Sequence, residues 1–177
     1  MFSKLCAASP ASATQLVEAS RLGAQAQELV LKPSSDGSPT DLTCVNMMCE
    51  HVGGPCICKL ARCLSKTPNL KRLDISGNKL GALPETLGDL SELTHLDVSG
   101  NALTDLSIVK RLKKLVSLKA DDNMVTSLDA EGLDELAEIS LCRNAFKNYP
   151  DLSWGSLLSP SFNIRLDGNP CMEGVDK

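Results

Sequence analysis

Five asparagines recur at nearly equal intervals along the chain, and this spacing restricts the possible fold more than any other feature. They are Asn78, Asn101, Asn123, Asn144 and Asn169, separated by 23, 22, 21 and 25 residues. Ahead of each lies a frame of apolar residues at constant offsets, of which Leu70, Leu73 and Ile75 form the first copy. The later copies are Leu93, Leu96 and Val98; Leu115, Leu118 and Ala120; Leu136, Ile139 and Leu141; and Ile164 with Leu166. Self-similarity at a period of about 20–50 residues predicts units that bury their apolar side chains by stacking on one another.

Residues 70–90, LKRLDISGNKLGALPETLGDL, contain one such unit. Their apolar residues keep neither the three-and-four spacing of an amphipathic helix nor the alternation of a half-buried strand. The sequence predicts a short strand at Leu73 and Ile75, a turn at residues 76–78 and a return segment after Pro84. Each leucine is expected to point into the coil, where its burial contributes about 1.5–3 kcal/mol. The asparagine amide is expected to bond backbone groups at the turn, because an unpaired buried peptide group costs about 1–3 kcal/mol.

These units resemble the leucine-rich repeat family, with its pattern L-x-x-L-x-L-x-x-N-x-L, over roughly residues 42–170. The resemblance implies an α/β fold, a curved right-handed leucine-rich repeat solenoid with parallel strands on the concave face. It also implies an N-terminal helical cap and loop at residues 1–41, about five to six coils at 42–170, and a polar tail at 171–177.

The coil at residues 42–69 is longer than the others and resembles the ribonuclease-inhibitor-like subclass of these repeats. Its expected strand residues are Leu42, Val45 and Met47, and its expected buried helix stripe is Ile57, Leu60, Ala61 and Leu64. Glu50 replaces the asparagine of this coil, so the turn contact is not expected there. The coils that follow are shorter and resemble the typical and short subclasses.

Residues 10–31 are predicted to be helical in part, with Ser9 and Pro10 as the N-cap and first-turn residues. Its apolar residues at helical spacing are Leu16, Ala19, Leu22, Ala26, Leu29 and Val30. We expect this helix to cap the open end of the solenoid, where the first coil would otherwise expose its core. Two alternatives are a partner-binding amphipathic helix and a truncated first strand at residues 28–31.

The composition restricts which partners and which cellular locations are expected for this chain. Eighteen basic against 22 acidic residues give a net charge of −4, which argues against nucleic acid and anionic membranes as direct partners. No apolar run is long enough to span a membrane or to serve as a secretory signal. The Ser/Ala-rich N-terminus weakly resembles an organellar targeting segment, but such segments usually hold more arginine. We therefore expect a cytoplasmic protein without membrane insertion, with a mitochondrial or other organellar location as the alternative.

A cluster of five cysteines is a candidate metal or redox site, whereas the adjacent acids Asp121 and Asp122, which could suggest calcium, are expected to be solvated surface residues. It comprises Cys44, Cys49, Cys56, Cys58 and Cys63, with His51 among them. No C-x2-C pair occurs, so the usual zinc-finger spacings are missing, and cytosolic thiols normally stay reduced. We expect Cys56 and Cys63 to act as small core residues, with metal binding and redox activity as less favoured alternatives.

The sequence offers no catalytic site and implies no cofactor. Only two histidines, His51 and His95, are present, and the expected neighbours of His95 are Arg72 and Ser117, which do not form a nucleophile, base and orienting group. The segment GGPCICK lacks the spacing of a phosphate-binding loop. We therefore predict that the chain is not an enzyme.

The remaining candidate is the concave face, which is lined by strand residues that alternate with the leucines. The predicted partner-binding residues are Arg72, Asp74, His95, Asp97, Ser117, Lys119, Asp121, Glu138, Ser140 and Arg165. Asp74 and Asp97 are expected to stack on neighbouring coils, and stacked like charges cost free energy unless something compensates them. This predicts an acidic contact for a basic protein segment.

The resemblance implies a non-catalytic protein–protein interaction module, either an adaptor or a regulatory subunit, although fold alone does not determine function. The alternative is a structural subunit built permanently into a large ribosomal, respiratory or axonemal assembly. An enzyme or metal sensor that uses the cysteine cluster is the third possibility.

Overall fold

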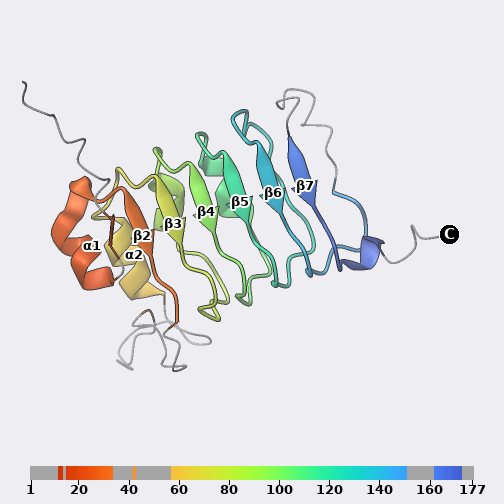
Figure 1. The fold of residues 1–177 in the computed structure, drawn as a ribbon, viewed down its shortest axis with the longest axis horizontal. Coiled ribbons are helices and arrows are strands. Elements are labelled where there is room, and N and C mark those ends of the chain that lie inside the picture. The colour runs from red at the N-terminus through yellow and green to blue at the C-terminus, as the bar shows by residue number, and fades with distance from the viewer. Residues whose placement is uncertain (1–11, 14, 34–41, 43–56, 151–161, 173–177) are drawn as a thin grey trace, which may run out of the picture.

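The computed structural model describes residues 12–13, 15–33, 42, 57–150 and 162–172. Seven short strands form one parallel sheet in chain order, so that each strand pairs with the next (Figure 1). The strands are β1 (Ser12–Ala13), β2 (Glu28–Val30), β3 (Arg72–Asp74), β4 (His95–Asp97), β5 (Ser117–Lys119), β6 (Glu138–Ser140) and β7 (Asn163–Arg165). Parallel pairing in sequence order is the arrangement that stacked repeats produce, and it confirms the predicted solenoid.

Helical turns return the chain from one strand to the next. They are α1 (Leu16–Leu22), η1 (Gly23–Gln25), α2 (Cys58–Leu64), η2 (Glu85–Asp89) and η3 (Ser107–Arg111), and a further turn, η5 (Pro170–Met172), follows β7. The return before β3 is an α-helix, whereas the returns before β4 and β5 are 3-10 turns. This difference follows from coil length, because a coil of 22 or 23 residues has less chain for the return than the segment that precedes β3. None of the helices among the described residues is long and apolar enough to cross a membrane.

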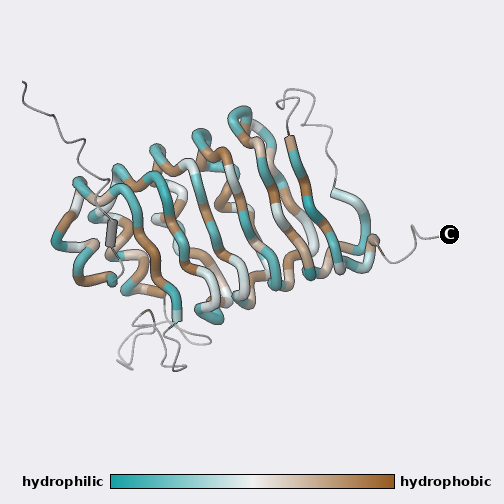
Figure 2. The backbone as a smooth tube through the Cα atoms, viewed as in Figure 1, coloured by the Kyte–Doolittle hydropathy of each residue, from teal (hydrophilic) through white to brown (hydrophobic). Residues whose placement is uncertain are grey.

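One apolar core runs the length of the array. The middle residue of each inner strand points into it: Leu73, Leu96, Leu118 and Ile139 are each at most 2% exposed. The tube coloured by hydropathy shows apolar and polar residues alternating along every coil (Figure 2). Because strand side chains alternate between faces, each three-residue strand turns its middle residue toward the core and its two flanking residues toward the opposite face.

The helix α2 lies near its predicted position but uses a different buried stripe. Leu60 and Leu64 are buried as expected, whereas Ile57 and Ala61 are only half-buried. Cys63 is buried instead, and its thiol Sγ lies 3.8 Å from the carbonyl oxygen of Leu16 on α1. The predicted core role of Cys63 is confirmed. Cys44, Cys49 and Cys56 lie outside the described residues.

The N-terminal helix is shorter than the apolar spacing predicted. The described helix α1 begins at Leu16 and ends at Leu22, and Gly23 follows it with a φ of 55°. Leu29 and Val30 are not helical, because they form strand β2 beside β3. The partly helical prediction holds for residues 16–22, its extension to Leu29 and Val30 is wrong, and the alternative of a strand at residues 28–31 is confirmed. The apolar spacing at Leu29 and Val30 fits both a helix and a strand, so pairing with β3 determines that these residues form a strand. Ser9 and Pro10 lie outside the described residues.

The same pairing corrects the expected neighbour of β3. Glu28 pairs with Arg72, and Val30 pairs with Asp74. The position beside β3 is therefore taken by β2, so the prediction of a strand containing Val45 and Met47 next to Arg72 is wrong. Residues 43–56 themselves lie outside the described part of the chain. The packing of α1 against α2 places the N-terminal helix at the end of the array (Figure 1).

Candidate functional site

The asparagines form a row along one edge of the coils, and their amides join neighbouring coils. The Asn123 amide nitrogen Nδ2 lies 3.1 Å from the carbonyl oxygens of Val98 and Ala120 and 3.0 Å from that of Asp121. Its oxygen Oδ1 accepts a hydrogen bond of 3.0 Å from the Leu103 backbone N–H. Equivalent amide bonds are made by Asn78, Asn101, Asn144 and Asn169. The row is a structural element and not a binding surface, because its polar atoms are used within the protein.

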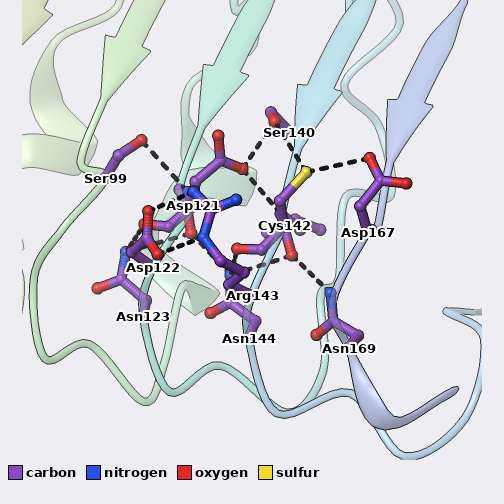
Figure 3. A network of polar contacts seen from close by, with 12 residues as sticks. Ser99, Asp121, Asp122, Asn123, Ser140, Cys142, Arg143, Asn144, Asp167 and Asn169 are labelled. Carbon is purple, nitrogen blue, oxygen red and sulfur yellow. Dashed lines mark hydrogen bonds and ion pairs between the residues drawn. The ribbon is translucent and has the colours of Figure 1, made fainter. Parts of the chain in front are cut away.

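The residue before each asparagine has a left-handed backbone, which explains a second feature of the sequence. Three coils use glycine there, at Gly77, Gly100 and Gly168. The other two use Asp122 and Arg143, each with a φ of 54°, a conformation that usually costs a non-glycine residue about 1–2 kcal/mol. These two side chains meet on neighbouring coils, with Arg143 Nη2 2.6 Å from Asp122 Oδ2 and Nε 2.5 Å from Oδ1 (Figure 3). Hydrogen bonding to Arg143 lowers the pKa of Asp122.

The predicted concave residues lie in two rows that cross the strands. The first row contains Glu28, Arg72, His95, Ser117, Glu138 and Asn163. The second row contains Val30, Asp74, Asp97, Lys119, Ser140 and Arg165. A third row, just beyond the strand ends, includes Asp121. From β3 onward this register is the one that the repeat spacing predicts. Glu28 and Lys32 were missed because sequence reasoning assigned Glu28 to a helix and Lys32 to a loop, and the apolar run ELVL was the signal for a strand.

At the N-terminal end of the face, charged residues are paired within the protein. Lys32 Nζ lies 2.8 Å from Asp74 Oδ2, and Arg72 Nε lies 3.8 Å from Glu28 Oε1. Partial burial raises the pKa of Asp74, but hydrogen bonds from Lys32 and Ser76 outweigh it, so the pKa is lowered overall. The stack of Asp74 and Asp97 is therefore compensated in part by Lys32, and the premise of uncompensated like charges is wrong.

At the centre of the face, around β4 and β5, two charged side chains lack ion pairs within the described residues. Asp97 accepts a hydrogen bond from the backbone N–H of Ser99, at 3.0 Å from Oδ1, but neither Asp97 nor Lys119 has an ion-pair partner among the described residues. His95 lies beside them, and its Nδ1 is 2.9 Å from the Thr94 hydroxyl. Burial and the neighbouring Arg72 lower the pKa of His95, so the imidazole is neutral near pH 7. These side chains line a hollow of about 590 Å³ that runs from β2 to β6.

Toward the C-terminal end, the third row is hydrogen-bonded to its neighbours. The carboxylate oxygen Oδ1 of Asp121 accepts from the Ser140 hydroxyl and from the Cys142 backbone N–H, each at 2.7 Å (Figure 3). The Cys142 thiol Sγ lies 3.6 Å from Asp167 Oδ2. Ser117 donates its hydroxyl to Glu138 Oε2 at 3.0 Å in the first row. These contacts fix side chains across coils and leave Asp97 and Lys119 as the charges available at the centre.

The described residues contain no group of three or more His, Cys, Asp or Glu side chains placed to hold a metal ion. Asp121 and Asp122, adjacent in sequence, have separate partners. Of the cysteine cluster, Cys58 and Cys63 are described, and both lie on α2. Burial raises the pKa of the Cys63 thiol, which keeps it protonated near neutral pH.

Comparison with known proteins gives the fold its name. The family model described as Leucine Rich repeats (2 copies) matches residues 68–111. The functional domain of InlJ from Listeria monocytogenes, which includes a cysteine ladder, is similar at a TM-score of 0.56 and 22% identity, covering 84% of this chain and 26% of that chain. The L. monocytogenes internalin InlF is similar at a TM-score of 0.54 and 20% identity, covering 86% and 44%. Internalin C2 from the same organism is similar at a TM-score of 0.55 and 23% identity, covering 86% and 66%.

This chain thus spans between about a quarter and two-thirds of the length of these structures. At such identities the likeness shows the fold alone. The parallel sheet, the recurring asparagines and the match at residues 68–111 make it a leucine-rich repeat fold with an N-terminal helix ahead of the repeats.

Proposed function

We propose that this chain is a non-catalytic adaptor or regulatory subunit that binds a protein partner through the concave face of its repeats. Curved arrays of this kind present an extended surface suited to such contacts. The observation that supports the proposal is the hollow between β2 and β6, which carries Asp97 and Lys119 at its centre without ion-pair partners among the described residues.

The chemistry of that centre favours a partner segment with both signs of charge. Asp97 and Lys119 occupy paired positions on neighbouring strands β4 and β5. A basic side chain of the partner would contact Asp97, and an acidic one would contact Lys119. Complementary charges of this kind guide the encounter and fix the orientation of the bound segment more than they add affinity. The neutral imidazole of His95 beside Asp97 adds a hydrogen-bonding group without changing the local charge.

Charge reversal at these two positions tests the proposal. The double variant Asp97→Lys with Lys119→Glu keeps the net charge and inverts the pattern at the centre of the face. Its matched control is Glu131→Lys with Lys147→Glu, which reverses two exposed charges outside the three concave rows. We expect proteins recovered with the tagged full chain in cells to be lost with the first variant and retained with the control. Recovery of the same proteins with all three chains would contradict binding through this face.

The reversal is placed at Asp97 and not at Asp74 because of the ion pair with Lys32. A lysine at position 74 would face Lys32, so that stability would fall together with any binding. The tagged chain also reports the compartment, for which the sequence favours the cytoplasm. Quantitative co-sedimentation with one large particle would instead identify a built-in subunit of an assembly.

A further inference from the structure

The charges on the concave face form a pattern that is complementary to itself. Asp97 on β4 and Lys119 on β5 occupy paired positions, and neither has an ion-pair partner among the described residues. One strand further out on each side, in the first row, Arg72 lies on β3 and Glu138 on β6. Each of these two pairs therefore places opposite charges at equal distances from the boundary between β4 and β5.

The outer pair, Arg72 and Glu138, can take a further charged partner. The Nε of Arg72 lies 3.8 Å from Glu28 Oε1, which is longer than a hydrogen bond, and the arginine side chain is 57% exposed. Glu138 is half-buried and accepts a hydrogen bond of 3.0 Å from the Ser117 hydroxyl, but it has no ion pair within the described ranges. Arg72, Asp97, Lys119 and Glu138 all line the same hollow.

We propose that the partner of the concave face is a second copy of this chain, related by a two-fold axis that runs parallel to the strands between β4 and β5. This rests on the proposed function, because it takes the concave face as the binding surface. The axis reverses the order of the strands, so that β4 of each copy faces β5 of the other and β3 faces β6. Asp97 then faces Lys119 twice and Arg72 faces Glu138 twice, since a two-fold interface uses the same surface on both copies. No like charges meet in the first or second row.

Other placements of a two-fold axis leave the central charges without opposite partners. An axis over β4 or β5 would oppose Asp97 or Lys119 to itself, and an axis between β3 and β4 would oppose Asp97 to Asp74. An axis between β5 and β6 would place Lys119 opposite Ser140. An axis across the strands would lay each strand on its own counterpart, so that Asp97 would meet Asp97 or the neutral His95. Like charges and buried charges without a partner cost free energy, so the axis between β4 and β5 is favoured.

The shape of the central coils allows two such faces to approach each other. An array curves where its return elements are wider than its strands, because strands lie about 4.8 Å apart and packed α-helices about 8–10 Å apart. The returns before β4 and β5 are the 3-10 turns η2 and η3, which are tighter than α-helices. We therefore expect a shallow face there, across which the long side chains of Lys119 and Arg72 reach the opposite carboxylates. Bridging water can fill the remaining space between the two hollows.

Sedimentation of the full chain over a range of concentrations tests this contact, and the unaltered chain is expected to form a dimer. Asp97→Lys and Lys119→Glu each replace two attractive contacts by two repulsive ones, so we expect each to raise the dimer dissociation constant by about tenfold or more. Glu131→Lys and Lys147→Glu make the same charge changes outside the concave rows and are expected to leave the dissociation constant unchanged. The double variant Asp97→Lys with Lys119→Glu restores opposite charges across the axis, and its dissociation constant is expected to return to within about threefold of the original.

Mixing the two single variants gives a readout that a folding defect cannot imitate. The Asp97→Lys chain is positive at both central positions and the Lys119→Glu chain is negative at both, so the mixture is expected to form a heterodimer although each variant alone dimerises weakly. An unaltered chain that stays monomeric at all concentrations would overturn the proposal. So would single variants that dimerise as tightly as the unaltered chain, or a mixture without heterodimers.

The double variant also separates this inference from the proposed function. It inverts the charges that a different protein would meet on the face, but it keeps two copies of the variant complementary to each other. Loss of cellular proteins from a chain that is always monomeric would overturn the second copy and leave the proposed function standing. A dimer with the expected responses, together with the same cellular proteins recovered from all variants, would support the second copy and contradict a different protein at this face.

Discussion

Replacing Asn123 by alanine tests whether the asparagine row holds the coils together. The side chain of Asn123 is 7% exposed and lies within hydrogen-bonding distance of four backbone groups, two on the preceding coil and two on its own. Alanine removes the amide and leaves the carbonyls of Val98 and Ala120 and the N–H of Leu103 without it, in a region closed to solvent.

The expected loss in the free energy of unfolding follows from the number of hydrogen bonds that the substitution removes. An NH2 group has two hydrogens, so the three carbonyls near Nδ2 share two full donations, and Oδ1 adds one acceptance. Each buried group left unpaired costs about 1–3 kcal/mol, and partial access of water reduces the sum. We expect Asn123→Ala to lower the free energy of unfolding by about 3 kcal/mol, which is a large fraction of the roughly 5–15 kcal/mol of a typical domain.

Urea denaturation followed by circular dichroism measures this loss, with Asn148→Ala as the control at an exposed asparagine. Asn123→Asp separates hydrogen bonding from side-chain volume, because it keeps the shape but turns a carboxylate toward the carbonyls of Val98 and Ala120. That variant is expected to lose at least as much stability as alanine at pH 7. If Asn123→Ala unfolds at the same urea concentration as Asn148→Ala, the row does not stabilise the array and the reasoning is wrong. Because neighbouring coils stabilise one another, we also expect a less cooperative transition.

Two further predictions concern single positions. Gly100→Ala is expected to cost about 1–2 kcal/mol in urea denaturation because Gly100 has a φ of 65°, whereas Gly81→Ala, at an open position without a positive φ, is expected to be nearly neutral; equal effects would contradict the backbone argument. Asp74→Asn is expected to reduce stability at pH 7, and the difference from the unaltered chain should shrink as the pH falls below the ordinary aspartate pKa of 3.8. The sign follows from the lowered pKa of Asp74, since a carboxylate with a lowered pKa stabilises the fold above its ordinary pKa of 3.8 and loses that contribution as it becomes protonated. A difference that stays constant with pH would show that the charge on Asp74 is not what stabilises this contact.

The repeats could be read from the sequence because their information is local and repeated. Each apolar frame has a fixed offset from its asparagine, so counting residues places His95 beside Arg72 and Lys119 beside Asp97 without any structural knowledge. A register error of one residue would turn every leucine toward solvent. From β3 onward the register of the concave rows therefore follows from the sequence.

The N-terminal part could not be predicted in the same way. Leu29 and Val30 continue the helical spacing of Leu16 and Leu22, yet they form a strand. In the sequence, residues 42–47 match the apolar pattern of a repeat strand as well as residues 28–31 do. The choice depends on which segment pairs with β3, and that contact joins residues more than 40 positions apart. The ion pair between Lys32 and Asp74 depends on the same contact, so the sequence showed two stacked acids without the lysine that compensates one of them.

The residues that build the fold differ from those proposed to bind a partner. The leucines and asparagines face inward and are fully used by neighbouring coils, so any set of outward strand residues is compatible with the same solenoid. The outward residues at β2 and β3 nevertheless contribute to stability, because Lys32 and Asp74 join the N-terminal strand to the repeats. Asp121 and Ser140 are likewise bonded to each other near the opposite end. At β4 and β5, Asp97 and Lys119 lie on the face without ion pairs to the described residues. A substitution there is expected to change the proposed binding while leaving the fold intact.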